Sequence, residues 1–168
     1  MMLYNLQTFE RVSVWPIGLE VRFNLKNLTK ITASFFGVGF APIAPGTWGS
    51  AAGALLAWLS GDWLIYWALG LSALGLRICR QAQVVFGTKD PKAFVLDEVC
   101  GMMLSVLWLP KNVSLYFWAF ILFRIFDIWK PWPISKIQDS KYPTSIMWDD
   151  LVAGVFANLI LQAAVRAV

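Results

Sequence analysis

AFVLDEVCGMMLSVLWL, residues 93–109, places two adjacent carboxylates, Asp97 and Glu98, inside an otherwise apolar stretch of a strongly hydrophobic chain. Ionisable side chains at membrane depth cost free energy unless they are paired, hydrated or bound to a cation. The stretch is also shorter than the roughly 20 residues that cross a bilayer comfortably. It therefore predicts a short helix that is tilted, half-inserted or buried by its neighbours, with a candidate functional site at its start.

The composition is that of an integral membrane protein. Of the 168 residues, 58% are hydrophobic and only 14% are charged, against about 25% in an ordinary soluble domain. No linker, low-complexity tract or internal repeat divides the chain, so one bundle is expected. The net charge of +4 comes from basic residues scattered between apolar runs. This pattern favours anionic lipid as the attracting surface, predicts no nucleic-acid partner and indicates no oligomeric state.

Histidine is absent from the chain. Its absence excludes Ser-His and Cys-His nucleophile pairs, histidine metal ligands and histidine general bases. The two cysteines, Cys79 and Cys100, lack a metal-ligand spacing and are interpreted as packing residues. Carboxylates, lysines and arginines must therefore carry any chemistry.

Five apolar segments predict the helices of an all-α integral membrane bundle. They cover residues 48–60, 63–78, 93–109, 113–129 and 148–168. We expect four or five membrane helices, some of them short or re-entrant. Residues 1–31 mix charges with apolar residues and are interpreted as an N-terminal arm that could lie at the membrane interface. Residues 32–168 are interpreted as the membrane-embedded domain.

Basic residues gather ahead of the first segment and in every second connection. They are Arg22, Lys26, Lys30, Arg77, Arg80, Lys89, Lys92, Lys130, Lys136 and Lys141. The positive-inside rule therefore predicts a cytoplasmic N-terminus and, for five spans, an external C-terminus. The same topology places three acidic groups near the cytoplasmic surface: Asp97 with Glu98, Asp127, and Asp149 with Asp150.

Carboxylates that converge at one depth repel one another unless a cation neutralises them. Oxygen-only ligation selects hard ions such as Mg²⁺ or Ca²⁺. Gly101 follows Asp97 by four residues, and Gly154 follows Asp150 at the same spacing. A glycine one turn away lets a neighbouring helix, a ligand or a headgroup approach the carboxylate closely.

Each acidic group also has a simpler interpretation. Acids at the start of a helix are favoured by the helix dipole, which would explain Asp149, Asp150 and Asp97 without a site. Asp127 has Arg124 three residues before it and Lys130 three residues after it, so a local ion pair would explain it. The occurrence of three groups at one level favours a site.

A loop rich in glycine and proline, GVGFAPIAPGTWGS at residues 37–50, leads into the first apolar segment. Free backbone N–H groups at such a helix start suit a phosphate. The alternative is a tight turn with Thr47 or Ser50 as an ordinary N-cap. Arg124 and Lys130 add positive charge beside the acids, either as phosphate contacts or as members of the positive-inside set. Together these parts are typical of metal-assisted phosphoryl transfer.

Four motifs, in order along the chain, resemble the bacterial phosphatidylglycerophosphatase A family. They are APGTWGS at residues 44–50, FVLDEVCG at 94–101, FRIFDIWKPWPI at 123–134 and IMWDDLVAG at 146–154. The resemblance covers the chain from about residue 32 onward. The chain departs from the family at residues 142–145, YPTS, where a glycine pair often precedes the double aspartate.

The resemblance implies a Mg²⁺-dependent phosphatase that converts phosphatidylglycerophosphate to phosphatidylglycerol at the bacterial inner membrane, with the active site toward the cytoplasm. On matching positions it implies metal ligands, catalytic acids and phosphate contacts. The metal candidates are Asp97, Glu98, Asp149 and Asp150. The catalytic candidates are Asp127, Asp149 and Asp150, and the substrate-binding candidates are Thr47, Arg124 and Lys130.

Three other functions remain open at this stage. A small transporter or proton relay would use carboxylates in helices, although it favours sites near the membrane midplane and internal repeats. A CDP-alcohol phosphotransferase would need spaced aspartates in one Gly- and Arg-containing helix motif, which the sequence lacks. A non-catalytic membrane partner protein is the third.

Overall fold

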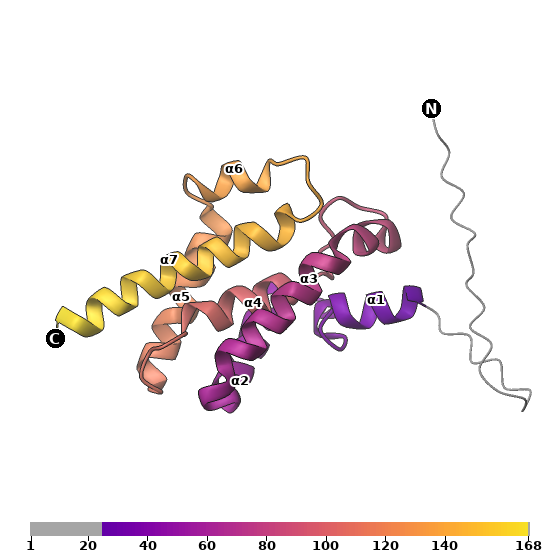
Figure 1. Cartoon of the computed structure of the whole chain (residues 1–168). Helices are drawn as coiled ribbons and strands as arrows, with labels where there is room; N and C mark the ends of the chain where they lie inside the picture. Colours follow the sequence, from indigo (N-terminus) through magenta and orange to yellow (C-terminus); the bar gives the residue numbers. More distant parts are fainter. Residues whose placement is uncertain (1–24, 168) are drawn as a thin grey trace, which may run out of the picture.

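The computed structural model describes residues 25–167, and this part of the chain consists of helices and connections without strands (Figure 1). The α-helices are α1 Leu25–Ala33, α2 Pro45–Ser60, α3 Leu64–Phe86, α4 Leu96–Ser105, α5 Val113–Trp129, α6 Ile134–Gln138 and α7 Ser145–Ala167, with short 3₁₀ turns η1 Val38–Phe40 and η2 Gly61–Trp63. Each of the five predicted apolar segments overlaps one helix, so the all-α bundle is confirmed.

Two helical stretches are long and apolar enough to cross a membrane by length and composition. They are Pro45–Phe86, which contains α2 and α3, and Ser145–Ala167, which is α7. The count of four or five membrane helices stays a prediction. Residues 1–24 of the predicted arm lie outside the described residues. The arm's remaining part enters α1, which packs against α3.

Local sequence signals set several helix ends. Pro45 occupies the first turn of α2, where its missing N–H costs nothing. The Asn112 side chain caps α5 by accepting hydrogen bonds from the backbone N–H groups of Ser114 and Leu115, at 2.8 and 3.4 Å. Gly87 ends α3 in the left-handed conformation, with φ of +73°.

The segment predicted at residues 93–109 forms a helix over Leu96–Ser105 only. The chain then turns, with Trp108 at a φ of +59° and Pro110 two residues later, and neither conformation continues a helix. At 1.5 Å per residue, α4 is about 15 Å long, roughly half the apolar thickness of a bilayer. It therefore does not span a membrane.

Helix α4 is the centre of the bundle. It contacts α2, α3, α5 and α7, and Figure 1 shows it between them. Every residue of α4 except Glu98 and Leu104 is buried. A helix that is apolar on all sides is stable only when other helices surround it, which is why this short stretch decides how the longer helices are arranged.

Helices α4 and α7 cross closely at two glycines. A Cβ atom on Gly154 would overlap the backbone of Gly101, and one on Gly101 would lie 2.6 Å from the carbonyl oxygen of Asp150. The sequence indicated that these glycines admit a neighbouring helix, a ligand or a headgroup; in the structure a neighbouring helix takes the space. The crossing places the start of α4 beside the start of α7.

Side-chain amides on α7 satisfy carbonyl groups at the other end of α4. Asn158 Nδ2 donates to the carbonyl oxygens of Ser105 and Leu107, at 3.1 and 2.8 Å, and Gln162 Nε2 donates to that of Leu107 at 3.2 Å. The last carbonyls of a helix have no partner within the helix, and leaving them unpaired in an apolar bundle costs free energy. These amides therefore allow α4 to end inside the protein.

The glycine crossing generates a stability prediction. We expect Gly154→Ala to lower the free energy of unfolding by about 1–3 kcal/mol, because an added methyl group forces α4 and α7 apart. Gly70→Ala is the matched control: Gly70 lies on the exposed surface of α3 with no atom near its would-be Cβ. Denaturant unfolding in detergent measures both variants, and equal stability of Gly154→Ala and the wild type would contradict the crossing.

Candidate active site

Five carboxylates meet at one end of the bundle, which we call the polar end. Asp97 and Glu98 lie in the first turn of α4, Asp127 in the last turn of α5, and Asp149 and Asp150 near the start of α7. All five line one cavity of about 710 Å³. The three acidic groups that are separated in the sequence therefore do share one level of the bundle.

Three of these carboxylates form a compact group. Oxygen atoms of Asp97, Glu98 and Asp150 lie within 4.8 Å of one another. Asp97 is 6% exposed and Asp150 is 3% exposed. Among the described residues, Glu98 Oε2 is buried without a hydrogen-bond partner. An oxygen without a partner among buried carboxylates is one that a cation could satisfy, and three carboxylates suit a hard divalent ion such as Mg²⁺.

Burial also changes the acidity of these carboxyl groups. Burial raises the pKa of the Asp97 carboxyl well above its ordinary value, and the neighbouring charge of Glu98 raises the pKa further. The Asp97 side chain accepts one hydrogen bond, from the backbone N–H of Glu98 at 2.9 Å, which favours the ionised form. A bound cation would supply the rest of the stabilisation that the ionised group requires.

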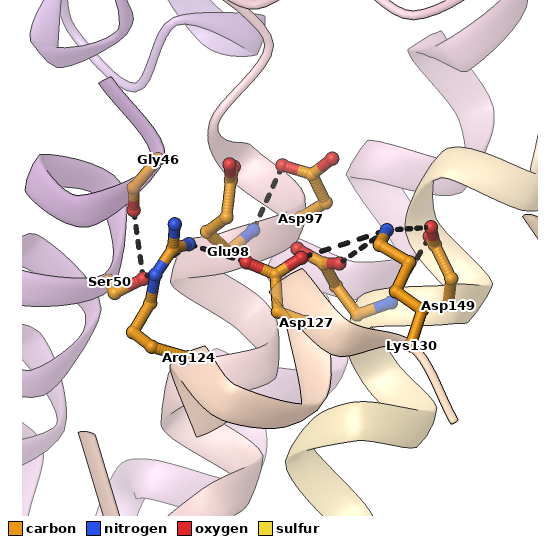
Figure 2. Close-up of polar contacts among 9 residues, drawn as sticks. Gly46, Ser50, Asp97, Glu98, Arg124, Asp127, Lys130 and Asp149 are labelled. Carbon is orange, nitrogen blue, oxygen red and sulfur yellow. Dashed lines mark hydrogen bonds and ion pairs between the residues drawn. The ribbon is translucent and has the colours of Figure 1, made fainter. Parts of the chain in front are cut away.

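Two basic side chains are paired with the remaining acids (Figure 2). The Arg124 guanidinium donates to Asp127 Oδ2 at 2.5 Å. The Lys130 ammonium lies 2.5 Å from Asp149 Oδ2, 3.7 Å from Asp127 Oδ1 and 3.8 Å from Asp150 Oδ1. The local ion pair predicted for Asp127 is thus present, and it forms part of the cavity wall.

Lys130 is held in its charged form. Burial by itself would lower the pKa of Lys130, but the carboxylates of Asp150, Asp149 and Asp127 outweigh this effect and raise the pKa above its ordinary value. Lys130 follows the last residue of α5 at a φ of +45°, which turns the backbone at the cavity. The polar end therefore keeps a permanent positive charge between three acids.

Asp149 occupies a different place from the other metal candidates. Its side chain pairs with Lys130 and accepts a hydrogen bond from the backbone N–H of Asp150 at 3.1 Å. Within residues 25–167, the close carboxylate group contains Asp97, Glu98 and Asp150 but not Asp149. The roles of these acids as metal ligands or catalytic groups remain predictions. The structure separates the three acids of the close group from Asp149, which contacts Lys130.

The glycine- and proline-rich loop reaches the cavity through Gly46. Helix α2 begins at Pro45 with Ala44 as its N-cap, so the alternative in which Thr47 or Ser50 is the N-cap is wrong. Residues 44–46 line the cavity, whereas Thr47 lies one residue farther along α2 and does not. A Cβ atom on Gly46 would overlap Glu98 Oε1 and lie 3.2 Å from Arg124 Nη1.

The comparison with known proteins identifies the family. The family model described as "Phosphatidylglycerophosphatase A" matches residues 31–165. The chain belongs to the phosphatidylglycerophosphatase A family. It is therefore an enzyme, a phosphoric monoester hydrolase, and the predicted resemblance is confirmed.

Three relatives match over most of their lengths. "Phosphatidylglycerophosphatase A" of Escherichia coli strain K12 is 37% identical over 83% of this chain and 85% of the relative. The protein of the same name from Haemophilus influenzae strain Rd is 34% identical, over 84% and 91%. A Bacteroides thetaiotaomicron protein named "Putative phosphatidylinositol-3-phosphatase" is 35% identical, over 77% and 88%. No solved structure matches the chain significantly.

Sequence reasoning missed parts of the cavity wall. The connection between α3 and α4 contributes Lys89 and Lys92, and the end of α6 contributes Gln138 and Asp139. The two lysines entered the sequence analysis only as markers of orientation. No local pattern distinguishes these residues from ordinary loop polar groups, because their positions depend on how the helices pack, as α3 does against α4 and α6 against α7.

Gly46 provides a prediction for the site. We expect Gly46→Ala to lower phosphatase activity about 10- to 100-fold, because the new methyl group displaces the Glu98 carboxylate and crowds Arg124. The protein should remain folded, since Gly46 lies at an open cavity. Phosphate release by purified protein measures the effect, with Gly70→Ala as the control. Unchanged activity of Gly46→Ala would contradict the close approach of α2 to Glu98.

Proposed function

We propose that the chain removes the terminal phosphate of phosphatidylglycerophosphate, leaving phosphatidylglycerol, and that the reaction requires Mg²⁺. Family membership supports a phosphatase role in phosphatidylglycerol synthesis. The observation that carries the finer proposal is the group of three carboxylates beside two paired cations in one cavity. A divalent cation requires carboxylate ligands, and a phosphate ester requires positively charged partners next to them.

Asp97, Glu98 and Asp150 would hold the Mg²⁺ ion. The support is the short separation of their oxygens and the buried Glu98 Oε2 without a partner. When bound, Mg²⁺ supplies a Lewis acid that polarises a phosphoryl oxygen. Asp149 is assigned to Lys130 rather than to the ion, because it lies in contact with the ammonium group.

Arg124 and Lys130 would bind the phosphate oxygens. A guanidinium has five N–H donors, so the pair with Asp127 leaves donors of Arg124 for the phosphate. Lys130 lies among three carboxylates and would contribute mainly its positive charge. Those pairs hold the two cations beside the cavity before the substrate arrives, which favours electrostatic stabilisation of a phosphoryl group. The backbone of Gly46 lies close to the Arg124 guanidinium and forms part of the cavity wall there.

Hydrolysis forms one P–O bond to water and breaks the P–O bond to the glycerol oxygen, which takes up a proton. Asp127 lies at the cavity between Arg124 and Lys130. We assign it to receive the proton of the attacking water.

The membrane setting follows from the same arrangement. The polar end carries Lys89, Lys92 and Lys130, in connections that the positive-inside rule assigns to the cytoplasm. We therefore propose an inner-membrane enzyme whose cavity opens toward the cytoplasmic leaflet. The alternative of a transporter or proton relay fits less well, because the carboxylates lie at one end of the bundle and not near its middle.

The activity prediction uses purified protein in detergent micelles. We expect phosphate release from phosphatidylglycerophosphate with Mg²⁺ and none after chelation, restored by adding Mg²⁺. Asp150→Asn should lower the rate by more than about 100-fold because it removes a ligand charge. Asp62→Asn, an exposed acid in η2, should retain the wild-type rate.

Phosphatidylinositol 3-phosphate forms the second arm of this assay, since one relative carries the name of a phosphatase for that lipid. Faster release from the inositol lipid than from phosphatidylglycerophosphate would contradict the proposed substrate while keeping the phosphatase chemistry. Release that is insensitive to chelation would contradict the metal requirement.

Orientation is tested by single-cysteine labelling in spheroplasts. A membrane-impermeant maleimide should label Asp62→Cys from outside, whereas Lys89→Cys should react only after permeabilisation. The native cysteines, Cys79 and Cys100, are buried, and are replaced by alanine for the measurement. Labelling of Lys89→Cys in intact spheroplasts would place the polar end on the external side and contradict the orientation.

A further inference from the structure

Ser50 is a buried serine that contacts the active site without lining its cavity. It lies in α2 and is 0% exposed. Its hydroxyl donates to the carbonyl oxygen of Gly46 at 2.8 Å, and the hydroxyl oxygen accepts a hydrogen bond from Arg124 Nη1 at 3.4 Å. Figure 2 shows this chain of contacts running from Gly46 through Ser50 to Arg124.

We propose that Ser50 is a positioning residue that holds the Arg124 guanidinium across the gap between α5 and α2, where it meets the substrate phosphate. This inference rests on the proposed function. Ser50 itself does not touch the substrate, and it acts through Arg124.

The geometry shows why Arg124 needs a second anchor. Asp127, its closest partner, lies three residues later on the same helix. An ion pair within one helix sets the distance of the guanidinium from α5 but leaves its direction free, because both side chains can move together. Ser50 is the partner on a different helix, so it fixes that direction.

The hydroxyl is well suited to this task. Its own proton is committed to the Gly46 carbonyl, so its oxygen points lone pairs toward the guanidinium. The contact of 3.4 Å is long for a hydrogen bond, so its loss should weaken phosphate binding and turnover without abolishing them. Gly46 belongs to the same turn and leaves space for Arg124 because it lacks a Cβ atom.

The simpler interpretation is that Ser50 only satisfies its own helix. Serines often donate to the carbonyl four residues earlier when they lie inside a helix. Ser60 in the same helix does so, with its hydroxyl 2.6 Å from the Leu56 carbonyl oxygen. Ser105 in α4 is equally buried and donates to the Met102 carbonyl oxygen at 2.7 Å. Neither contacts Arg124, so both are matched controls.

The test is a double-mutant cycle with Ser50→Ala, Arg124→Ala and the double variant. The first readout is kcat/KM for phosphate release from phosphatidylglycerophosphate. The second is the rise in melting temperature that inorganic phosphate causes in the presence of Mg²⁺, which needs no turnover. Ser50→Cys repeats the measurement with a near-isosteric group that is a poor hydrogen-bond acceptor, should Ser50→Ala fail to fold.

We expect Ser50→Ala to lower kcat/KM about tenfold and to reduce the phosphate-induced stabilisation. In the Arg124→Ala background it should have no further effect on either readout. Ser60→Ala and Ser105→Ala should behave as wild type.

Two results would overturn the inference: wild-type behaviour of Ser50→Ala, or an equal loss with and without Arg124. Both results leave the proposed function intact, because that proposal is tested on the wild type, by its substrate preference and its dependence on Mg²⁺.

Discussion

The crossing of α4 and α7 at Gly101 and Gly154 is the constraint on which the site depends. These two glycines allow the two helices to touch along their backbones, and this contact brings Asp97 and Glu98 beside Asp150. Close packing of apolar helices thus supplies the force that holds like charges together. Repulsion between these buried carboxylates lowers the stability of the folded bundle, and a bound cation can offset this effect. The same contact between α4 and α7 therefore affects both the stability of the fold and the geometry of the candidate site.

Charge around the cavity is arranged in two groups. The carboxylates of Asp97, Glu98 and Asp150 lie together, and within residues 25–167 their one basic partner at salt-bridge distance is Lys130, 3.8 Å from Asp150. Asp127 and Asp149 lie in closer contact with Arg124 and Lys130. In the proposed function, the first group would hold the metal ion and the second would place positive charge against the phosphate. Lys130 joins the two.

Much of this arrangement could be predicted from the sequence. The apolar segments and the loop charges predicted the helices and the shared level of the acids, because both signals are local and additive. The family motifs then predicted the enzyme class. Local signals could not predict three other features: the short length of α4, the N-cap at Ala44 and the pairing of Asp149 with Lys130. They depend on which surfaces meet, as in the contact of Ser50 with Arg124, separated by 74 residues in the chain.

The amides of Asn158 and Gln162 have a consequence for where charge can lie in the bundle. They close the far end of α4 with hydrogen bonds to Ser105 and Leu107, and buried Val106 and Leu107 follow directly. The residues of α4 after Glu98 are all uncharged. Five carboxylates and two cations therefore gather at the start of the central helix, while its other end stays apolar and fully hydrogen-bonded.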